Sequence, residues 1–196
     1  KLINQIIFPS GFQLRPYVSN YRNYPNDYSF LVSYPKSGST WLRFMLADVL
    51  NNDFKGFQNI NSIIPGLDDF RHWQELNNAP HNLCKSHHYF NPEFKKVVLL
   101  VRDPRSVCVS QYFFLQRKGL IETNTFETHF NRFLYTSHPK YGNWGQHTAS
   151  WIATSSNNKP ILIVKYEDLL LNSTEILKSV LEFLEIEYHP EKIERA

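Results

Sequence analysis

Residues 28–42 read Tyr-Ser-Phe-Leu-Val-Ser-Tyr-Pro-Lys-Ser-Gly-Ser-Thr-Trp-Leu, an apolar run followed by a loop of small polar residues. The run from Tyr28 to Tyr34 lacks regular polar alternation, which is typical of a strand buried on both faces. After the loop, apolar residues recur at the spacing of one helix face: Leu42, Met45, Leu46, Val49 and Leu50. This stretch therefore predicts a strand, a tight loop and an amphipathic helix, in that order.

Three more short segments have the composition of strands. Val97 to Val101 and Ile161 to Val164 are apolar and contain β-branched residues, so we expect both to be buried on both faces. Asn82 to Lys85 is expected to add a shorter strand to the same sheet. The segments between the strands are too long for hairpins and carry helical features, which predicts parallel pairing. The expected fold class is α/β, a three-layer sandwich with a central parallel sheet flanked by helices.

Helix starts and loops complete this outline. Pro104 suits the first position of a helix. Asn172 and Glu175 form a variant capping box before an apolar stripe that ends at Leu184. Residues 77–80 and 154–160 read as surface loops. Because no repeat or low-complexity tract divides the chain, we expect one domain over residues 1–196.

The overall composition is that of an ordinary globular protein, with 42% hydrophobic and 20% charged residues. The 21 basic and 18 acidic residues give a net charge of +3, too balanced for a protein that coats nucleic acid. We therefore expect no nucleic-acid partner. No apolar run in the sequence approaches the roughly 18 residues that a membrane span needs, so no membrane segment is expected.

The two cysteines, Cys84 and Cys108, lie in apolar stretches, which favours buried thiols over a disulfide framework or a metal site. Free thiols fit a reducing compartment and predict a cytoplasmic protein. Lys1 in place of Met indicates a trimmed start, so a removed N-terminal anchor or targeting segment stays open.

The loop at residues 34–41 follows the first strand, where ligands bind in open α/β sheets. Its small residues lead into a helix, so backbone N–H groups and the helix dipole can converge on an anion beside the positive charge of Lys36. An ordinary turn capped by Thr40 is the alternative. Trp41 could stack on a purine or pack into the core. Lys36 precedes Gly38, whereas the lysine of a nucleotide-triphosphate P-loop follows the last glycine, which disfavours a magnesium-dependent kinase.

Polar residues also follow the second and third apolar runs. Arg102 lies at a strand tip and Ser110 lies further along the next helix. An ion pair of Asp103 with Arg102 or Arg105 is the structural alternative to a ligand site. Tyr166 follows the last strand, where it could face a nucleotide base or cap the core.

The segment Lys85-Ser86-His87-His88 follows the short strand. A histidine can take a proton from a hydroxyl near neutral pH, and a lysine beside it can stabilise developing negative charge. A surface or core histidine is the alternative for each. Adjacent histidines in extended chain point in opposite directions and no third ligand is near, so we expect no metal site.

Taken in this order, these segments resemble the sulfotransferase family that uses 3′-phosphoadenosine 5′-phosphosulfate (PAPS). Residues 35–42 look like the family's 5′-phosphosulfate loop, and residues 102–110 look like its 3′-phosphate motif. Lys85-Ser86-His87 matches the segment that carries the family's catalytic base. Residues 141–151 resemble a Gly-Ser-Trp…His…Trp segment near the acceptor site, and residues 166–168 match the family's Tyr-Glu-Asp.

The resemblance implies a PAPS-dependent enzyme that transfers a sulfuryl group by in-line displacement to a hydroxyl, or with less support an amine, and releases 3′-phosphoadenosine 5′-phosphate (PAP). It implies a small-molecule, lipid or carbohydrate acceptor and no metal. It assigns His87 as general base, with Lys36 and Lys85 supporting charge; His88 takes this role if the local register differs. The implied donor contacts are Lys36 at the sulfate and bridging oxygen, Ser37, Gly38, Ser39 and Thr40 at the 5′-phosphate, Arg102 and Ser110 at the 3′-phosphate, and Trp41 and Tyr166 at the adenine.

The sequence departs from the family's pattern at its C-terminus. The family's Arg-Lys-Gly segment, which also contacts the 3′-phosphate, is expected well beyond the last helix, and the sequence stops at Ala196. Arg117-Lys118-Gly119 has the same letters in the wrong place. A P-loop-like nucleotide kinase and a non-catalytic nucleotide-binding module of the same fold are the alternatives. Aromatic residues that could line an acceptor pocket select no acceptor class: Phe12, Tyr17, Tyr89, Phe90, Phe113 and Phe114.

Overall fold

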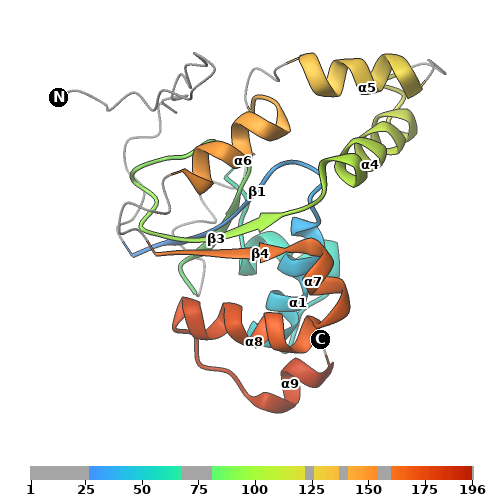
Figure 1. The fold of residues 1–196 in the computed structure, drawn as a ribbon. Helices are drawn as coiled ribbons and strands as arrows, with labels where there is room; N and C mark the ends of the chain where they lie inside the picture. The colour runs from blue at the N-terminus through green and yellow to red at the C-terminus, as the bar shows by residue number, and fades with distance from the viewer. Residues whose placement is uncertain (1–26, 68–80, 122–125, 137–140, 154–159, 196) are drawn as a thin grey trace.

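The computed structural model describes residues 27–67, 81–121, 126–136, 141–153 and 160–195 (Figure 1). Four parallel strands form one sheet in the order β2-β1-β3-β4, with bounds β1 (Ser29–Ser33), β2 (Leu83–Ser86), β3 (Lys96–Val101) and β4 (Ile161–Lys165). In register, Ser29 of β1 pairs with Leu83 of β2 and with Lys96 of β3. Each predicted strand forms within one residue of its expected ends, and the parallel sheet is confirmed.

Helices lie against both faces of this sheet and beyond the end of its strands (Figure 1). They are α1 (Ser39–Leu50), α2 (Ile60–Ile63), α4 (Pro104–Arg117), α5 (Phe126–Tyr135), α6 (Trp144–Ile152), α7 (Tyr166–Leu171), α8 (Ser173–Leu184) and α9 (Pro190–Arg195), with a 3₁₀ turn η1 (Gly56–Gln58). Residues of α1, α2, α8 and α9 pack with Leu31 and Leu100 on one face. Trp151 of α6 packs with Phe30 and Leu99 on the other, and Figure 1 shows α6 and α8 on opposite sides. The predicted three-layer α/β architecture is confirmed.

The start of α4 agrees with the sequence pattern, whereas the start of α8 does not. Pro104 occupies the first turn of α4, and the Asp103 side chain accepts a hydrogen bond from Arg105 N at 2.8 Å. Asn172 precedes α8 as expected, but its side chain makes no capping hydrogen bond, so the predicted capping box is wrong. Asn172 also ends α7, where its N–H donates to Asp168 O at 2.8 Å. Because Asn172 is the only residue between the two helices, its backbone ends α7 and its side chain does not cap α8.

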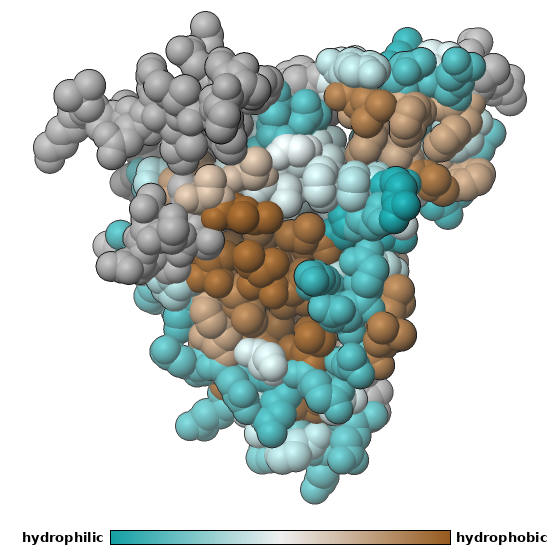
Figure 2. All heavy atoms as spheres, viewed as in Figure 1, coloured by the Kyte–Doolittle hydropathy of each residue, from teal (hydrophilic) through white to brown (hydrophobic). Residues whose placement is uncertain are grey.

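Strand β4 is more exposed than its sequence predicts. Ile163 is 43% exposed, so burial on both faces is wrong for this strand. The reason is topological: β4 is the last strand in the described sheet, and it pairs only with β3. Figure 2, viewed from the same side as Figure 1, shows a brown apolar area at the place where β4 crosses the middle of Figure 1.

Both cysteines are buried thiols, as expected. Within the described residues, no helix is both long and apolar enough to cross a membrane. The loops predicted at residues 77–80 and 154–159 lie outside the described residues, and a single domain over residues 1–196 stays a prediction.

Candidate active site

The loop between β1 and α1 turns at two residues with left-handed backbone, Lys36 (φ 71°) and Gly38 (φ 97°). Gly38 caps α1, and the N–H groups of Trp41 and Leu42 donate to its carbonyl at 3.0 and 3.3 Å. Thr40 therefore lies inside the first turn and is not the cap that an ordinary Ser/Gly turn would need. Since Gly38 has no side chain, it leaves the first N–H groups of α1 without a side-chain acceptor, as at anion-binding helix N-termini.

Tyr166, the first residue of α7, lies directly against Gly38. A Cβ atom on Gly38 would be 2.4 Å from Tyr166 Cδ2, closer than any side chain tolerates. Trp41 packs edge-on against the same ring, with centroids 5.8 Å apart. Both aromatic residues are half-buried at the edge of the core that α1 shares with α8. The structure thus brings together the two residues predicted to contact adenine.

Arg102, at the end of β3, joins this group. Its guanidinium carbon is 4.2 Å from the centroid of the Tyr166 ring, and its Nη1 donates to Lys36 O at 3.2 Å. Among the described residues, Arg102 Nε and Ser37 Oγ are buried and have no hydrogen-bond partner. Buried polar atoms are rarely left unpaired, so these two atoms fit a site that a polar ligand completes.

The positive charge at this loop has no counterpart in the described part of the protein. Lys36 Nζ lies 4.2 Å from the centroid of the Phe114 ring on α4. Burial lowers the pKa of Lys36, and the charges of Arg117 and Arg102 lower it further. No described carboxylate forms an ion pair with Lys36 or Arg102. An anion would relieve the repulsion between these side chains.

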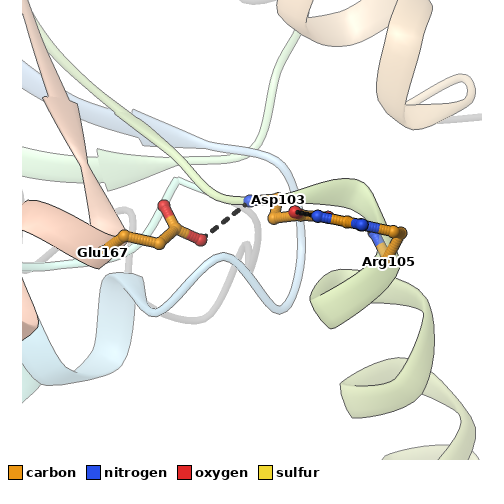
Figure 3. Close-up of polar contacts among 3 residues, drawn as sticks. All are labelled: Asp103, Arg105 and Glu167. Carbon is orange, nitrogen blue, oxygen red and sulfur yellow. Dashed lines mark hydrogen bonds and ion pairs between the residues drawn. The ribbon is translucent and has the colours of Figure 1, made fainter.

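The neighbouring arginine behaves differently (Figure 3). Arg105 Nε donates to Asp103 Oδ1 at 3.0 Å, and this pairing lowers the pKa of Asp103 to about 2. The ion-pair alternative is therefore confirmed for Arg105, whereas Arg102 has other contacts. Glu167 Oε1 accepts a hydrogen bond from Asp103 N at 3.0 Å and so ties α7 to the β3–α4 turn. The sequence matched residues 166–168 to the family but predicted no role for Glu167.

The roles that the resemblance implies for Ser110 and Lys85 are not tested by their positions. Ser110 is half-buried within α4, and its joint use with Arg102 stays a prediction. Lys85 pairs in register with Leu31, and its Cδ lies near Gly66. Its support of charge near His87 also stays a prediction.

His87 follows β2 and reaches to the end of β1. Its Nδ1 lies 2.6 Å from Ser33 O, and because a carbonyl only accepts, Nδ1 carries the hydrogen. In the neutral ring, Nε2 is then the nitrogen that can take a proton. Tyr141 packs edge-on against the ring, with centroids 5.7 Å apart. His88 is only 3% exposed, which favours His87 as the histidine that meets a substrate.

Helix α6 contacts the backbone of this histidine segment. The helix begins with a capping box in which Gln146 N donates to Asn143 Oδ1 at 2.8 Å and Asn143 N donates to Gln146 Oε1 at 3.3 Å. His147 Nε2 lies 3.1 Å from His87 O, and Trp151 Nε1 donates to His88 O at 3.0 Å. The resemblance placed this helix near the acceptor, but neither the capping box nor these contacts was predicted. Asn143 and Gln146 at the spacing of a capping box were the available signal.

Two tyrosines, Tyr34 and Tyr89, pack against the His147 ring of α6, with centroids 5.6 and 5.9 Å away. Burial, with Tyr89 and Cys108 nearby, raises the pKa of Tyr34 to about 12, so its hydroxyl stays neutral and donates to Gly142 O at 3.4 Å. Tyr89 OH donates to Gln146 Oε1 at 3.1 Å. Of the other aromatic candidates, Phe113 is 53% exposed, and Phe12 and Tyr17 lie outside the described residues.

The described residues include no group of three or more potential metal ligands, and metal independence stays a prediction.

Residues 26–196 match the family model described as the sulfotransferase domain, so the chain belongs to the sulfotransferase family. This confirms the resemblance. The chain is 27% identical over 175 residues to a 3-alpha-hydroxysteroid sulfotransferase of Cavia porcellus, covering 82% of this chain and 60% of that protein. It is 28% identical over 176 residues to sulfotransferase 2A6 of Mus musculus, covering 84% of this chain and 61% of that protein.

A crystal structure of mouse sulfotransferase SULT7A1 complexed with PAP matches with a TM-score of 0.68 at 26% identity. That match covers 88% of this chain and 63% of the mouse chain. The chain thus spans about three fifths of the length of these relatives, between 60% and 63%.

Proposed function

We propose that this protein transfers a sulfuryl group from PAPS to a hydroxyl acceptor. The observation that carries the proposal is the convergence of Lys36, Ser37 and Arg102 beside Tyr166. Among the described residues, two cations there lack a carboxylate partner and two buried polar atoms lack a hydrogen-bond partner. An anionic nucleotide supplies the oxygens that such a cradle needs. The PAP bound to mouse SULT7A1 supports a nucleotide of this charge.

The residues present fit the parts of this donor. Lys36 and the N–H groups of residues 37–40 would hold the 5′-phosphosulfate, because the helix start has no side-chain cap. Arg102 and Ser110 would hold the 3′-phosphate. Trp41 and Tyr166 would flank the adenine.

The donor, when bound, supplies the sulfuryl group. As the bond between the acceptor oxygen and sulfur forms, the bond from sulfur to the bridging oxygen breaks, and its electron pair stays on the phosphate of PAP. His87 Nε2 takes the acceptor's proton, since Nδ1 already donates to Ser33 O. Lys36 stabilises charge on the bridging oxygen, and Lys85 supports the charge that develops on the acceptor side.

The acceptor that we propose is a small-molecule or lipid hydroxyl with an apolar face. The Tyr141 ring, which packs edge-on against His87, supports this choice. The name of the Cavia porcellus relative, a 3-alpha-hydroxysteroid sulfotransferase, makes hydroxysteroids the first acceptors to test. A carbohydrate would also suit aromatic surfaces and belongs in the same panel.

Calorimetric titration with PAP and with ATP, each with and without magnesium, tests the donor site. We expect PAP to bind at least about tenfold more tightly than ATP, because contacts to the 3′-phosphate are charge-assisted. Equal or tighter ATP binding that magnesium strengthens would overturn the proposal in favour of a kinase. Tight PAP binding without transfer of labelled sulfate to any acceptor by the full-length protein would indicate a non-catalytic module.

A further inference from the structure

We propose that α6 positions the general base, and that His147 is the residue through which it acts. The proposal rests on the proposed function, in which His87 takes the acceptor's proton. His147 does not touch the reacting atoms in this scheme; it holds the main chain of the residue that does.

Three side chains from one face of α6 bind backbone groups of residues 87, 88 and 90. His147 contacts His87 O at 3.1 Å, Trp151 Nε1 donates to His88 O at 3.0 Å, and Ser150 Oγ accepts from Phe90 N at 3.1 Å. These anchors follow the spacing i, i+3 and i+4 of a helix face. His147, Ser150 and Trp151 are 1%, 5% and 0% exposed, so water does not compete for the contacts.

These contacts replace the hydrogen bonds that a strand would provide. Strand β2 ends at Ser86, so residues 87–90 leave the ladder that holds the rest of the sheet. The segment nevertheless has to hold the His87 ring against Ser33 O. Helix α6 fixes the main chain of the segment from the other side. His87 is thereby held at both its ring and its main chain.

The protonation states of the two histidines follow from their partners. His87 O only accepts, so His147 Nε2 carries a hydrogen, whereas His87 carries its hydrogen on Nδ1. The His147 ring therefore acts as a donor through Nε2, and the His87 ring keeps Nε2 as the basic nitrogen. Loss of the His147 donor would release the His87 carbonyl, and the Nδ1 contact with Ser33 would then no longer be enforced.

The test compares three α6 variants with the wild-type protein. His147→Leu removes the donor and keeps an apolar side chain, His147→Gln retains a donor near the position of Nε2, and Ile152→Ala changes an exposed site on the same helix. Nitrogen-15 spectra of the histidine rings report the His87 tautomer without turnover. Steady-state kinetics and PAP titration report catalysis and donor binding separately.

We expect His147→Leu to lose the Nδ1–H form of His87 and to lower kcat about ten- to a hundredfold, a scale typical of a misplaced catalytic group. PAP affinity should stay within about twofold because the donor loop is untouched, His147→Gln should recover most of kcat, and Ile152→Ala should match the wild type. A wild-type tautomer and kcat in His147→Leu would overturn the proposal.

If His147→Leu fails to fold, Trp151→Phe tests the positioning of the segment by α6, because it removes the indole donor to His88 O and keeps an aromatic ring in the buried site. An unchanged His87 tautomer and unchanged kcat in Trp151→Phe would then overturn it. The proposed function fails on a different result: a wild-type protein that binds no PAP or transfers no sulfate. The nitrogen-15 comparison still tests positioning in that case.

Discussion

The donor end and the base end of the site are held together in different ways. At the donor end, Ser37 Oγ and Arg102 Nε are buried without a partner among the described residues. At the base end, the His87 ring forms a hydrogen bond with Ser33 O, and the His87 carbonyl forms one with His147. The donor end keeps polar atoms of its predicted ligand residues available, whereas the base end uses polar atoms to position a side chain, although Trp144 Nε1 at the start of α6 is also buried without a partner among the described residues.

This difference matches what each end has to do in the proposed reaction. A donor cradle gains affinity when a ligand completes its hydrogen bonds, so unpaired atoms are useful there. A general base gains rate from a fixed orientation, so supporting hydrogen bonds are useful there. Substitutions at the two ends should therefore separate donor binding from turnover.

The largest expected effect is that of His87→Ala at the base end. The variant should lose about 10²- to 10⁴-fold in kcat, the usual contribution of a general base, and bind PAP almost as the wild type does. Labelled sulfate transfer and PAP titration measure the two quantities.

His189→Ala, at an exposed histidine between α8 and α9, is the matched control and should be neutral. Near-normal turnover in His87→Ala would make His88 the better candidate. A loss of PAP binding equal to the loss of turnover would contradict the separation of the two ends.

An intermediate effect is expected for Gly38→Ala at the donor end. The new Cβ would collide with Tyr166 and would also have to adopt a φ of 97°. PAP affinity should fall by about tenfold or more, since both the helix start and the aromatic neighbour move.

Gly119→Ala separates the collision with Tyr166 from the left-handed backbone as the cause of the lost PAP affinity. Gly119 also has a positive φ, 64°, but a Cβ there meets nothing within 4 Å. It should cost about 1–2 kcal/mol in free energy of unfolding, the usual penalty of a left-handed residue, and leave PAP binding unchanged. Equal losses of PAP affinity in the two variants, measured by titration, would show that the contact with Tyr166 does not matter.

The smallest effect is expected for Arg105→Ala, next to the donor end. This exposed pairing lowers the pKa of Asp103 to about 2 from its usual value of 3.8, so its stabilisation is present above about pH 4 and is lost as the pH falls through about 2. Urea unfolding of wild type and variant should differ slightly at neutral pH and converge in acid. PAP affinity should not change, whereas a clear loss would show that Arg105 rather than Arg102 faces the ligand.

Much of the donor end could be predicted because its residues follow strand ends. Parallel strands deliver their carboxyl ends to one edge of the sheet, so Lys36, Arg102 and Tyr166 had to lie near one another. The unpaired state of Ser37 and Arg102, and the link from Glu167 to Asp103, depend on side-chain packing that no spacing rule contains. Asn172 shows the limit of local rules, since a good capping sequence made no cap where two helices meet at one residue.

Residue periodicity and local backbone preference were enough to predict the four strand segments, the helices that begin near residues 40, 104 and 173, the loop at residues 34–41 and the two buried cysteines. The exposure of Ile163 depended instead on three-dimensional packing, since burial of a strand depends on what lies next to it in the sheet. Three-dimensional packing also decided the hold of α6 on His87, whose contact with His147 joins residues 60 positions apart. Such a contact is set by how a helix packs across the sheet, and the sequence of the helix records only which face is buried.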